Sequence, residues 1–312
     1  MNNNYKSAIK NRYDFVMIYD VENGNPNGDP DAGNLPRIDP ETGHGIVTDV
    51  CIKRKIRNSI VLRNNEKSGF EIYIQQDAVL SNQDKHGVDA ANAADKKDKD
   101  KRSQSFREAM CEKFFDIRAF GAVMTTAAKD PSLINSAGQV RGPIQIAFGR
   151  SIDPIVPREI TITRMAVATD KDKEKAEKEG SDESGGSRST MGRKAIVPYG
   201  VYRQEGYISA NLASAVTGFS DTDLEAFWDA VIHMFDEDRS AARGKMALRE
   251  LIVFKHDSSL GNAPSHKLFD RVKISCTEGI HVPRKYTDYN VTICDDSLPP
   301  GVEIIRKYQD ND

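Results

Sequence analysis

The sequence predicts an α+β fold of the ferredoxin-like type, enlarged by insertions. Residues 13–20 are rich in β-branched and aromatic side chains and indicate a buried strand. Two segments repeat apolar residues at helical spacing, residues 49–62 and 221–235. Strand-like segments lie between and after these helices, so the order of elements matches a βαββαβ unit, which is also the order of RNA-recognition-type domains.

The first strand leads into a long loop, from Val21 to about Ile46. Its Asn, Gly, Pro and Asp residues favour turns, and a loop of this length inside a domain is more often functional than incidental. Thr48 or Asp49 can cap the helix that follows.

The next segments alternate between predicted elements and polar stretches. Residues 70–74 are expected to form a strand and residues 106–115 a helix. Residues 84–102 contain few large apolar side chains, which predicts a solvent-exposed excursion or a flexible insert. Residues 141–149 and 160–165 alternate as strands do, and we expect these two strands to pair.

Residues 169–194 contain almost no core-forming side chain, which predicts a mobile, protruding loop. A strand at 197–208, the helix at 221–235 with Ser220 or Asp221 as its cap, and a strand at 251–254 follow. The remainder is expected to form short strands separated by turns.

Composition excludes several classes of protein. The 312 residues carry 44 Lys and Arg against 47 Asp and Glu, and this net charge of −3 at first argues against nucleic-acid binding. No apolar run is long enough to span a bilayer and the N-terminus lacks a signal core, so we expect a cytoplasmic protein without a membrane partner. The four cysteines form no CxxC pair and the histidines no HExxH motif, which predicts reduced thiols and neither metal nor cofactor.

The window from Cys51 to Arg63 is the most informative, because it contains five cations and no acid. This pattern predicts an anion-binding helix face, with an ordinary solvated face as the alternative. The helix begins directly after the Gly- and Asn-rich loop, so its free N–H groups and positive dipole end lie near that loop. Lys53 and Arg57 are one turn apart with Arg54 beside them, a spacing that suits successive phosphates.

Other cations lie at the ends of predicted strands. Arg118 with Phe120, Arg141 with Gln145, and Arg164 are candidates for RNA contact, and an aromatic ring such as Phe120 can stack on a base. Each of these residues taken singly is more often part of the core or an ordinary surface residue.

The long loop also contains carboxylates, at Asp29, Asp31, Asp39 and Glu41. A calcium-loop spacing fails, because Pro30 and Pro36 occupy the positions that require Gly and Glu. Turn-forming roles are therefore favoured, and no catalytic residue is predicted; P-loop, GxGxxG and GxSxG motifs are absent from the sequence.

The segment NRYDFVMIYDVENGNPNGDPDAGNLPRIDPETGHGIVTDVCIKRKIRN, residues 11–58, resembles the backbone subunit of type I-C CRISPR Cascade, a member of the RAMP superfamily. DIRAFGAVM (116–124), RGPIQIAFGRSIDP (141–154) and RSAARGKMALREL (239–251) extend the resemblance. It implies one elaborated domain over residues 1–312, with an RRM-type palm, inserted fingers at 70–115 and a protruding thumb loop at 169–196.

The resemblance also implies a function. Several copies would polymerise along a CRISPR guide RNA (crRNA), hold its phosphate backbone and present its bases to target DNA, together with other Cascade subunits and a separately recruited nuclease-helicase. Thr48, Lys53, Arg54 and Arg57 match the RNA-backbone helix of the family. The full set of expected RNA-contacting residues is Asn25, Asn27, Arg37, Thr48, Lys53, Arg54, Arg57, Arg118, Phe120, Arg141, Gln145, Arg164, Met191, Arg193 and Lys194.

Two alternatives remain at this point. Related type III subunits cut target RNA with a loop aspartate, so the chain can also be read as a metal-dependent endoribonuclease using Asp29, Asp31 or Asp39. A protein scaffold without RNA contact is the third reading.

Overall fold

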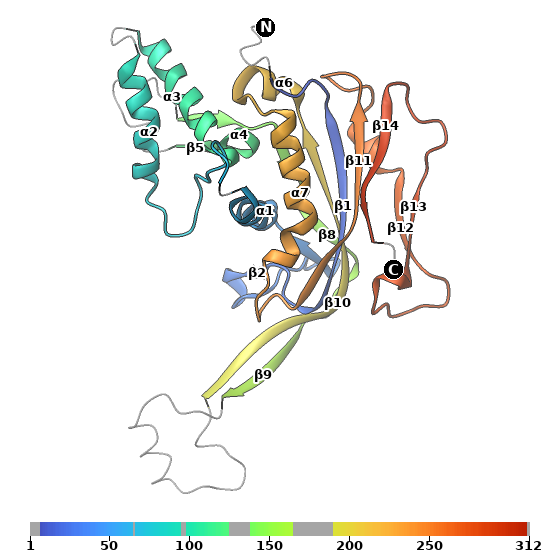
Figure 1. Cartoon of the computed structure of the whole chain (residues 1–312). Coiled ribbons are helices and arrows are strands. Elements are labelled where there is room, and N and C mark those ends of the chain that lie inside the picture. The colour runs from blue at the N-terminus through green and yellow to red at the C-terminus, as the bar shows by residue number, and fades with distance from the viewer. Residues whose placement is uncertain (1–6, 65, 95–97, 125–137, 165–189, 311–312) are drawn as a thin grey trace, which may run out of the picture.

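A large antiparallel sheet organises the chain in the computed structural model, which describes residues 7–64, 66–94, 98–124, 138–164 and 190–310. Figure 1 shows the sheet nearly edge-on, with helices on one side. The strand order is β14 (Val302–Gln309), β11 (Lys245–His256), β1 (Tyr13–Gly24), β10 (Thr190–Ile208), β8 (Gly149–Pro154) and β4 (His44–Val47), and β7 (Ile144–Ile146) and β9 (Arg158–Arg164) also pair with β10.

The predicted ferredoxin-like order is confirmed within this sheet. Helix α1 (Asp49–Asn64) follows β1 and helix α7 (Asp221–Glu237) precedes β11, while β11, β1, β10 and β8 lie side by side. The first strand extends to Gly24, four residues beyond the predicted end. Ser220 caps α7 through a capping box with Asp223, as expected.

The two faces of β1 bury different cores, which explains its continuous apolar sequence. Phe15, Met17 and Tyr19 pack against α1 and α7, whereas Val16 and Ile18 face the C-terminal segment. That segment contains α8 (Ser265–Phe269), β12 (Val272–Cys276), the 3₁₀ turn η4 (Tyr286–Asp288) and β13 (Tyr289–Ile293), and it matches the predicted short strands.

Residues 70–94 and 98–124 form a helical unit with a core of its own. It comprises α2 (Leu80–Ala93), α3 (Lys99–Lys113), α4 (Phe115–Phe120) and β5 (Gly121–Val123), the last paired with β6 (Gln139–Arg141). Figure 1 shows α2 and α3 standing beside the sheet. The sequence predicted a solvent-exposed excursion or a flexible insert at 84–102. Many of its described residues are exposed, but they form the helices α2 and α3, which the sequence did not predict. Small residues let the two helices pack closely: a Cβ on Gly87 would lie 2.6 Å from the Phe106 ring.

Two strand predictions are also wrong. Residues 70–74 form only a single bridge, between Glu71 and Phe114, because the N–H groups of Tyr73 and Ile74 donate to a side-chain carboxylate instead of a strand. Residues 141–149 do not pair with 160–165. Strand β10 is long enough to pair with β7, β8 and β9 in succession along one edge.

The predicted loops are partly ordered. Residues 21–46 contain the end of β1, the short hairpin of β2 (Gly28–Asp29) and β3 (Leu35–Pro36), the 3₁₀ turn η1 (Pro30–Ala32) and part of β4. Most of the predicted loop at 169–194 lies outside the described residues, and residues 190–194 begin β10. Between β10 and α7 lie the single turns α6 (Ala210–Leu212) and η3 (Ala213–Thr217).

The four cysteines are free thiols, as predicted. Among the described residues, no helix is both long and apolar enough to span a membrane.

Glu250 is a buried carboxyl group on β11. Its side chain accepts a hydrogen bond from the Tyr286 hydroxyl at 3.0 Å, while its second oxygen has no partner. Burial raises the pKa of Glu250, and the Tyr286 hydrogen bond only partly opposes that shift.

Because the folded state holds the Glu250 proton more tightly than the unfolded state does, the wild type is stabilised as the pH falls and loses this stabilisation as the pH rises through the folded-state pKa. Glu250→Gln keeps an acceptor for Tyr286 and should therefore have a higher melting temperature than wild type at pH 7, with a gap that narrows towards acid pH. Thermal unfolding across a pH series measures the gap. The exposed Glu278→Gln is the control, and a gap that widens on acidification would contradict the assignment.

Candidate nucleic-acid interface

The long loop is anchored to the N-terminus of α1 by two residues predicted to contact RNA. The Asn27 side-chain carbonyl accepts hydrogen bonds from both the backbone N–H and the hydroxyl of Thr48, each at 2.9 Å. The Thr48 hydroxyl in turn accepts from the Cys51 N–H at 3.4 Å. These side chains hold the loop on the helix end, where its N–H groups and positive dipole lie.

The other loop candidates also have partners inside the loop. The Asn25 amide donates to the Asn34 carbonyl at 2.7 Å and the side chain is buried. Arg37 forms an ion pair with Asp29 at 3.3 Å. Both residues therefore shape the loop in this structure.

Four of the five cations of α1 are neutralised by acids. Arg54 is the exception, since it has no ion pair or hydrogen bond to any residue that the structure describes. The pairs are Lys53 with Asp49, Lys55 with Asp238, Arg57 with Asp116, and Arg63 with Asp229 and Glu237. The acid-free window in the sequence therefore does not produce a uniformly positive face, because most of these acids come from α4, α7 and the residue that follows α7.

Phe120 does not offer its ring to a base. The ring is 7% exposed and lies 5.8 Å from the Lys53 ammonium and 5.3 Å from the Arg57 guanidinium. Cation–π contacts of this kind position the cations over the ring. The expected stacking role is therefore corrected to a packing role beneath α1.

Arg118 is likewise turned into the protein. Its guanidinium forms a bidentate pair with Asp223, at 2.7 and 3.0 Å, and donates to the carbonyls of Gly69, Cys111 and Glu112. With its donors satisfied internally, Arg118 is not accessible to RNA in this structure, and the predicted contact is corrected to a structural one.

Arg141 and Gln145 remain on the surface, in the segment that packs against the end of α4. Arg141 pairs across the β5–β6 ladder with Gly121, the residue directly after Phe120, and Phe120 contacts Lys53 and Arg57. Arg141 is exposed and has no partner among the described residues, and the Gln145 amide makes only a 3.4 Å bond to the Gly142 carbonyl. We call the side chains of Lys53 and Arg54 on α1, Arg141 on β6 and Gln145 on β7 the α1–β6 surface.

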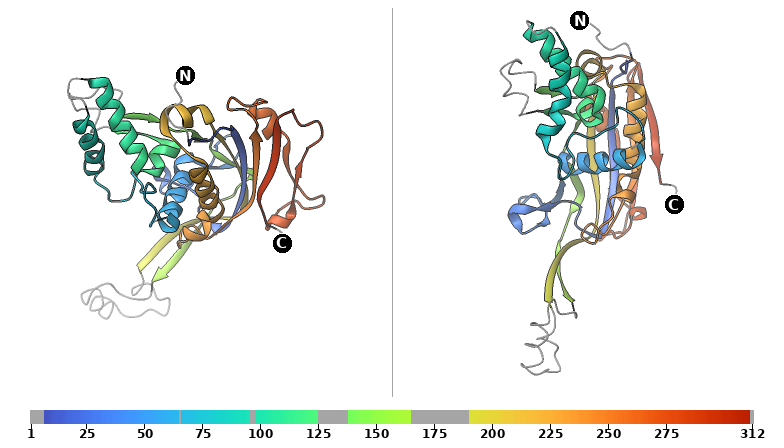
Figure 2. Two further views of the ribbon diagram at one scale, coloured as in Figure 1. Left: turned by 45° about the horizontal axis from the view of Figure 1, so that its top comes forward. Right: turned by 60° about the vertical axis from the view of Figure 1, so that its left-hand side comes forward.

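The candidates on β9 and β10 lie elsewhere. Figures 1 and 2 show these strands extending away from the sheet as a hairpin. Arg193 is exposed and faces Glu159 at 3.7 Å, and Lys194 is half-buried. The side chains of Arg164 and Met191 lie outside the described part, although their backbones belong to the β9–β10 ladder.

The loop carboxylates have structural partners. Asp29 pairs with Arg37 and accepts the Asp31 N–H, and Asp39 pairs with Arg150 at 2.9 Å. The Arg150 hydrogen bond holds the pKa of Asp39 below its usual value. Across the described ranges, no group of three His, Cys, Asp or Glu side chains is arranged to hold a metal ion. Nothing in the sequence marks Arg150 as the partner of Asp39, because only the fold brings β8 against the loop.

Comparisons with known proteins agree with the resemblance in the sequence. A family model described as CRISPR-associated protein Cas7 matches residues 11–294. The chain belongs to the Cas7 family. A CRISPR-associated protein Cas7 from Haloferax volcanii is 26% identical over 262 residues, which cover 81% of this chain and 72% of that protein. The expected RAMP-type relationship is thus confirmed, while no subtype is specified and type I-C stays a prediction.

Solved structures similar to this Cas7 chain include a subunit of a CRISPR RNA-guided surveillance complex in a pre-nicking state, with a TM-score of 0.48 and 11% identity over 78% of each chain. A chain of a second CRISPR RNA-guided surveillance complex has a TM-score of 0.42 and 13% identity, covering 78% of this chain and 68% of its own length.

Replacing Arg118 by Gln should destabilise the fold, because the change leaves Asp223 and several carbonyls without their buried partner. Losing one partner of a buried ion pair costs about 3–5 kcal/mol. Urea unfolding measures this loss. Arg239→Gln, which removes an exposed pair with Asp236, should change stability by less than about 0.5 kcal/mol. Equal stability of both variants would show that the Arg118 pair is not structural.

Proposed function

We propose that this Cas7 chain is a non-catalytic backbone subunit that binds CRISPR guide RNA at the α1–β6 surface. The observation that carries the proposal is Arg54, a cation on the helix that begins at the end of the long loop, which has no partner among the residues that the structure describes. Membership of the Cas7 family supports it. Arg141, which pairs with Gly121 directly after Phe120, adds a second guanidinium that no described residue engages.

The chemistry of the surface suits phosphate better than bases. Guanidinium groups recognise phosphate oxygens through paired N–H donors, whereas the Phe120 ring that Lys53 contacts is buried. Lys53 is held by Asp49 only one turn away, at a partly exposed position, so a phosphate can replace that carboxylate at small cost. Contacts of this kind tolerate any RNA sequence and weaken with salt.

The proposal extends to the assembly. Several copies form a helical filament along the guide, whose bases then pair with target DNA, in company with other Cascade subunits of type I-C and a recruited nuclease-helicase. The α2–α3 unit serves as the fingers, and the β9–β10 hairpin, with Arg193 and Lys194 near its base, belongs to the thumb. The assembly is cytoplasmic, and base pairing instead of protein side chains reads the target.

Arg54→Gln should weaken assembly on guide RNA while leaving the monomer folded, because Arg54 has no partner among the described residues. Losing one phosphate contact should lower the slope of log affinity against log salt by about one. Arg63→Gln is the matched control: it removes the same charge from the same helix, but at a residue already paired with Asp229 and Glu237. Filter binding across a salt series measures both. Equal affinities and slopes for Arg54→Gln and wild type would contradict the proposal.

The endoribonuclease alternative has a separate test. The purified chain is incubated with guide RNA and complementary RNA, with Mg²⁺ or with EDTA. We expect the RNA to stay intact in both, because Asp29 and Asp39 are engaged in ion pairs with Arg37 and Arg150. Metal-dependent cleavage that Asp29→Asn, Asp31→Asn or Asp39→Asn abolishes would overturn the non-catalytic assignment.

A further inference from the structure

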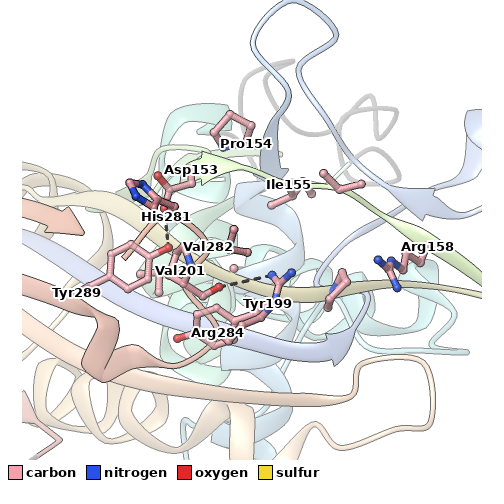
Figure 3. A pocket seen from close by; sticks show the side chains of 14 residues that line it. Asp153, Pro154, Ile155, Arg158, Tyr199, Val201, His281, Val282, Arg284 and Tyr289 are labelled. Atoms are coloured by element: carbon pink, nitrogen blue, oxygen red, sulfur yellow. Dashed lines mark hydrogen bonds between the residues drawn. The ribbon is translucent and has the colours of Figure 1, made fainter. Parts of the chain in front are cut away.

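A groove lies over β10 on the side of the sheet that faces the C-terminal segment. Its volume is about 400 Å³, and Figure 3 shows the side chains that line it. One rim is the connection from β8 to β9 and the other is the loop at 281–284, just before η4. The floor residues Tyr199 and Val201 belong to the core opposite α1 and α7, so the groove is separate from the α1–β6 surface.

The floor of the groove is apolar, and its polar atoms are already satisfied. Ile155, Val201 and the two tyrosine rings of Tyr199 and Tyr289 are buried. The Tyr289 hydroxyl donates to Asp153 at 2.6 Å, and the Tyr199 hydroxyl donates to a buried carboxylate behind the floor, that of Asp20, at 3.0 Å. The floor therefore offers apolar contact and no unused hydroxyl.

The two rims have the same chemistry. Each carries one exposed valine, Val156 at 73% and Val282 at 60%, and one exposed arginine, Arg158 or Arg284. Neither guanidinium has a carboxylate partner in the part of the chain that the structure describes, since Arg284 donates only to the neighbouring Pro283 carbonyl.

Charge and shape together favour one class of ligand. Asp153 is the one acid among the lining residues, and it is engaged by Tyr289, so the rims are positive. Exposed valines beside unpaired arginines match the apolar centre and polar rim of a protein interface. A nucleic acid fits less well, because both tyrosine rings are buried and the valines offer nothing to phosphate.

We propose that this groove binds an acidic segment of another polypeptide, beyond the RNA binding proposed above. An aliphatic side chain of that segment packs between Val156 and Val282, and carboxylates on either side of it pair with Arg158 and Arg284. Exposed guanidinium groups with planar paired donors are suited to bind carboxylates in this way.

The test uses the full-length chain and three fluorescein-labelled probes: a peptide of alternating Glu and Val, the same peptide with Lys in place of Glu, and an oligouridine of similar length. Binding is followed by fluorescence polarisation for wild type and for the Arg158→Gln, Arg284→Gln double variant. Arg306→Gln is the matched control, because Arg306 is exposed, lies on β14 and, among the described residues, donates a hydrogen bond to Gln309 alone. Circular dichroism checks that every variant is folded.

The proposal predicts saturable binding of the Glu peptide, at least about tenfold weaker in the double variant and unchanged in Arg306→Gln. The Lys peptide should not bind. A Val156→Ser, Val282→Ser variant should also weaken binding of the Glu peptide, because the apolar anchor is lost. Absence of Glu-peptide binding, equal binding of both peptides, equal loss in Arg306→Gln, or oligouridine binding that depends on Arg158 and Arg284 would each overturn the proposal.

Discussion

The short helix α4 carries the two buried charges on which the arrangement of the other helices depends. Its Asp116 carboxylate accepts from the Arg57 side chain and from the N–H groups of Tyr73 and Ile74. Two residues later, Arg118 reaches Asp223 at the start of α7. A charge removed from water must find a partner with good geometry, so these contacts fix α1, α7 and the helical unit relative to one another. The same constraint turns two predicted RNA-binding arginines, Arg57 and Arg118, inward.

The pairing of most cations with acids also bears on how a chain of net charge −3 can, under the proposed function, offer a site for RNA. Positive character at the α1–β6 surface arises at Arg54 and Arg141, the cations there that no described residue pairs with, and not from a local excess of Lys and Arg. A single copy of the chain, with few unpaired cations on this surface, should bind RNA weakly. Under the proposed function, affinity for RNA then depends on repeated copies along one guide, and this dependence disfavours binding to unrelated RNA.

The spacing of apolar residues was sufficient to predict the elements that bury one regular face or run. Strand β1, helices α1 and α7 and their ferredoxin-like order follow from apolar spacing, and Ser220 was identifiable as a cap. Long-range partners were not predictable. Nothing near Lys55 in the sequence indicates that it forms an ion pair with Asp238. Likewise, nothing near Tyr73 indicates that its backbone N–H donates to the Asp116 carboxylate and not to a neighbouring strand. Helix α2 escaped prediction because its buried face is made of small residues such as Gly87 and Ala91, which carry no apolar signal.

Under the proposed function, guide RNA lies on the α1–β6 surface. Ultraviolet cross-linking of the complex assembled on guide RNA, followed by mass spectrometry of the linked peptides, locates the RNA. We expect cross-links in peptides that contain Arg54 and in peptides that contain Arg141 or Gln145, and none in those lining the groove at Arg158 and Arg284. Cross-links confined to the C-terminal segment from Ser265 to Gln309, with none on α1 or β6, would contradict the proposed function.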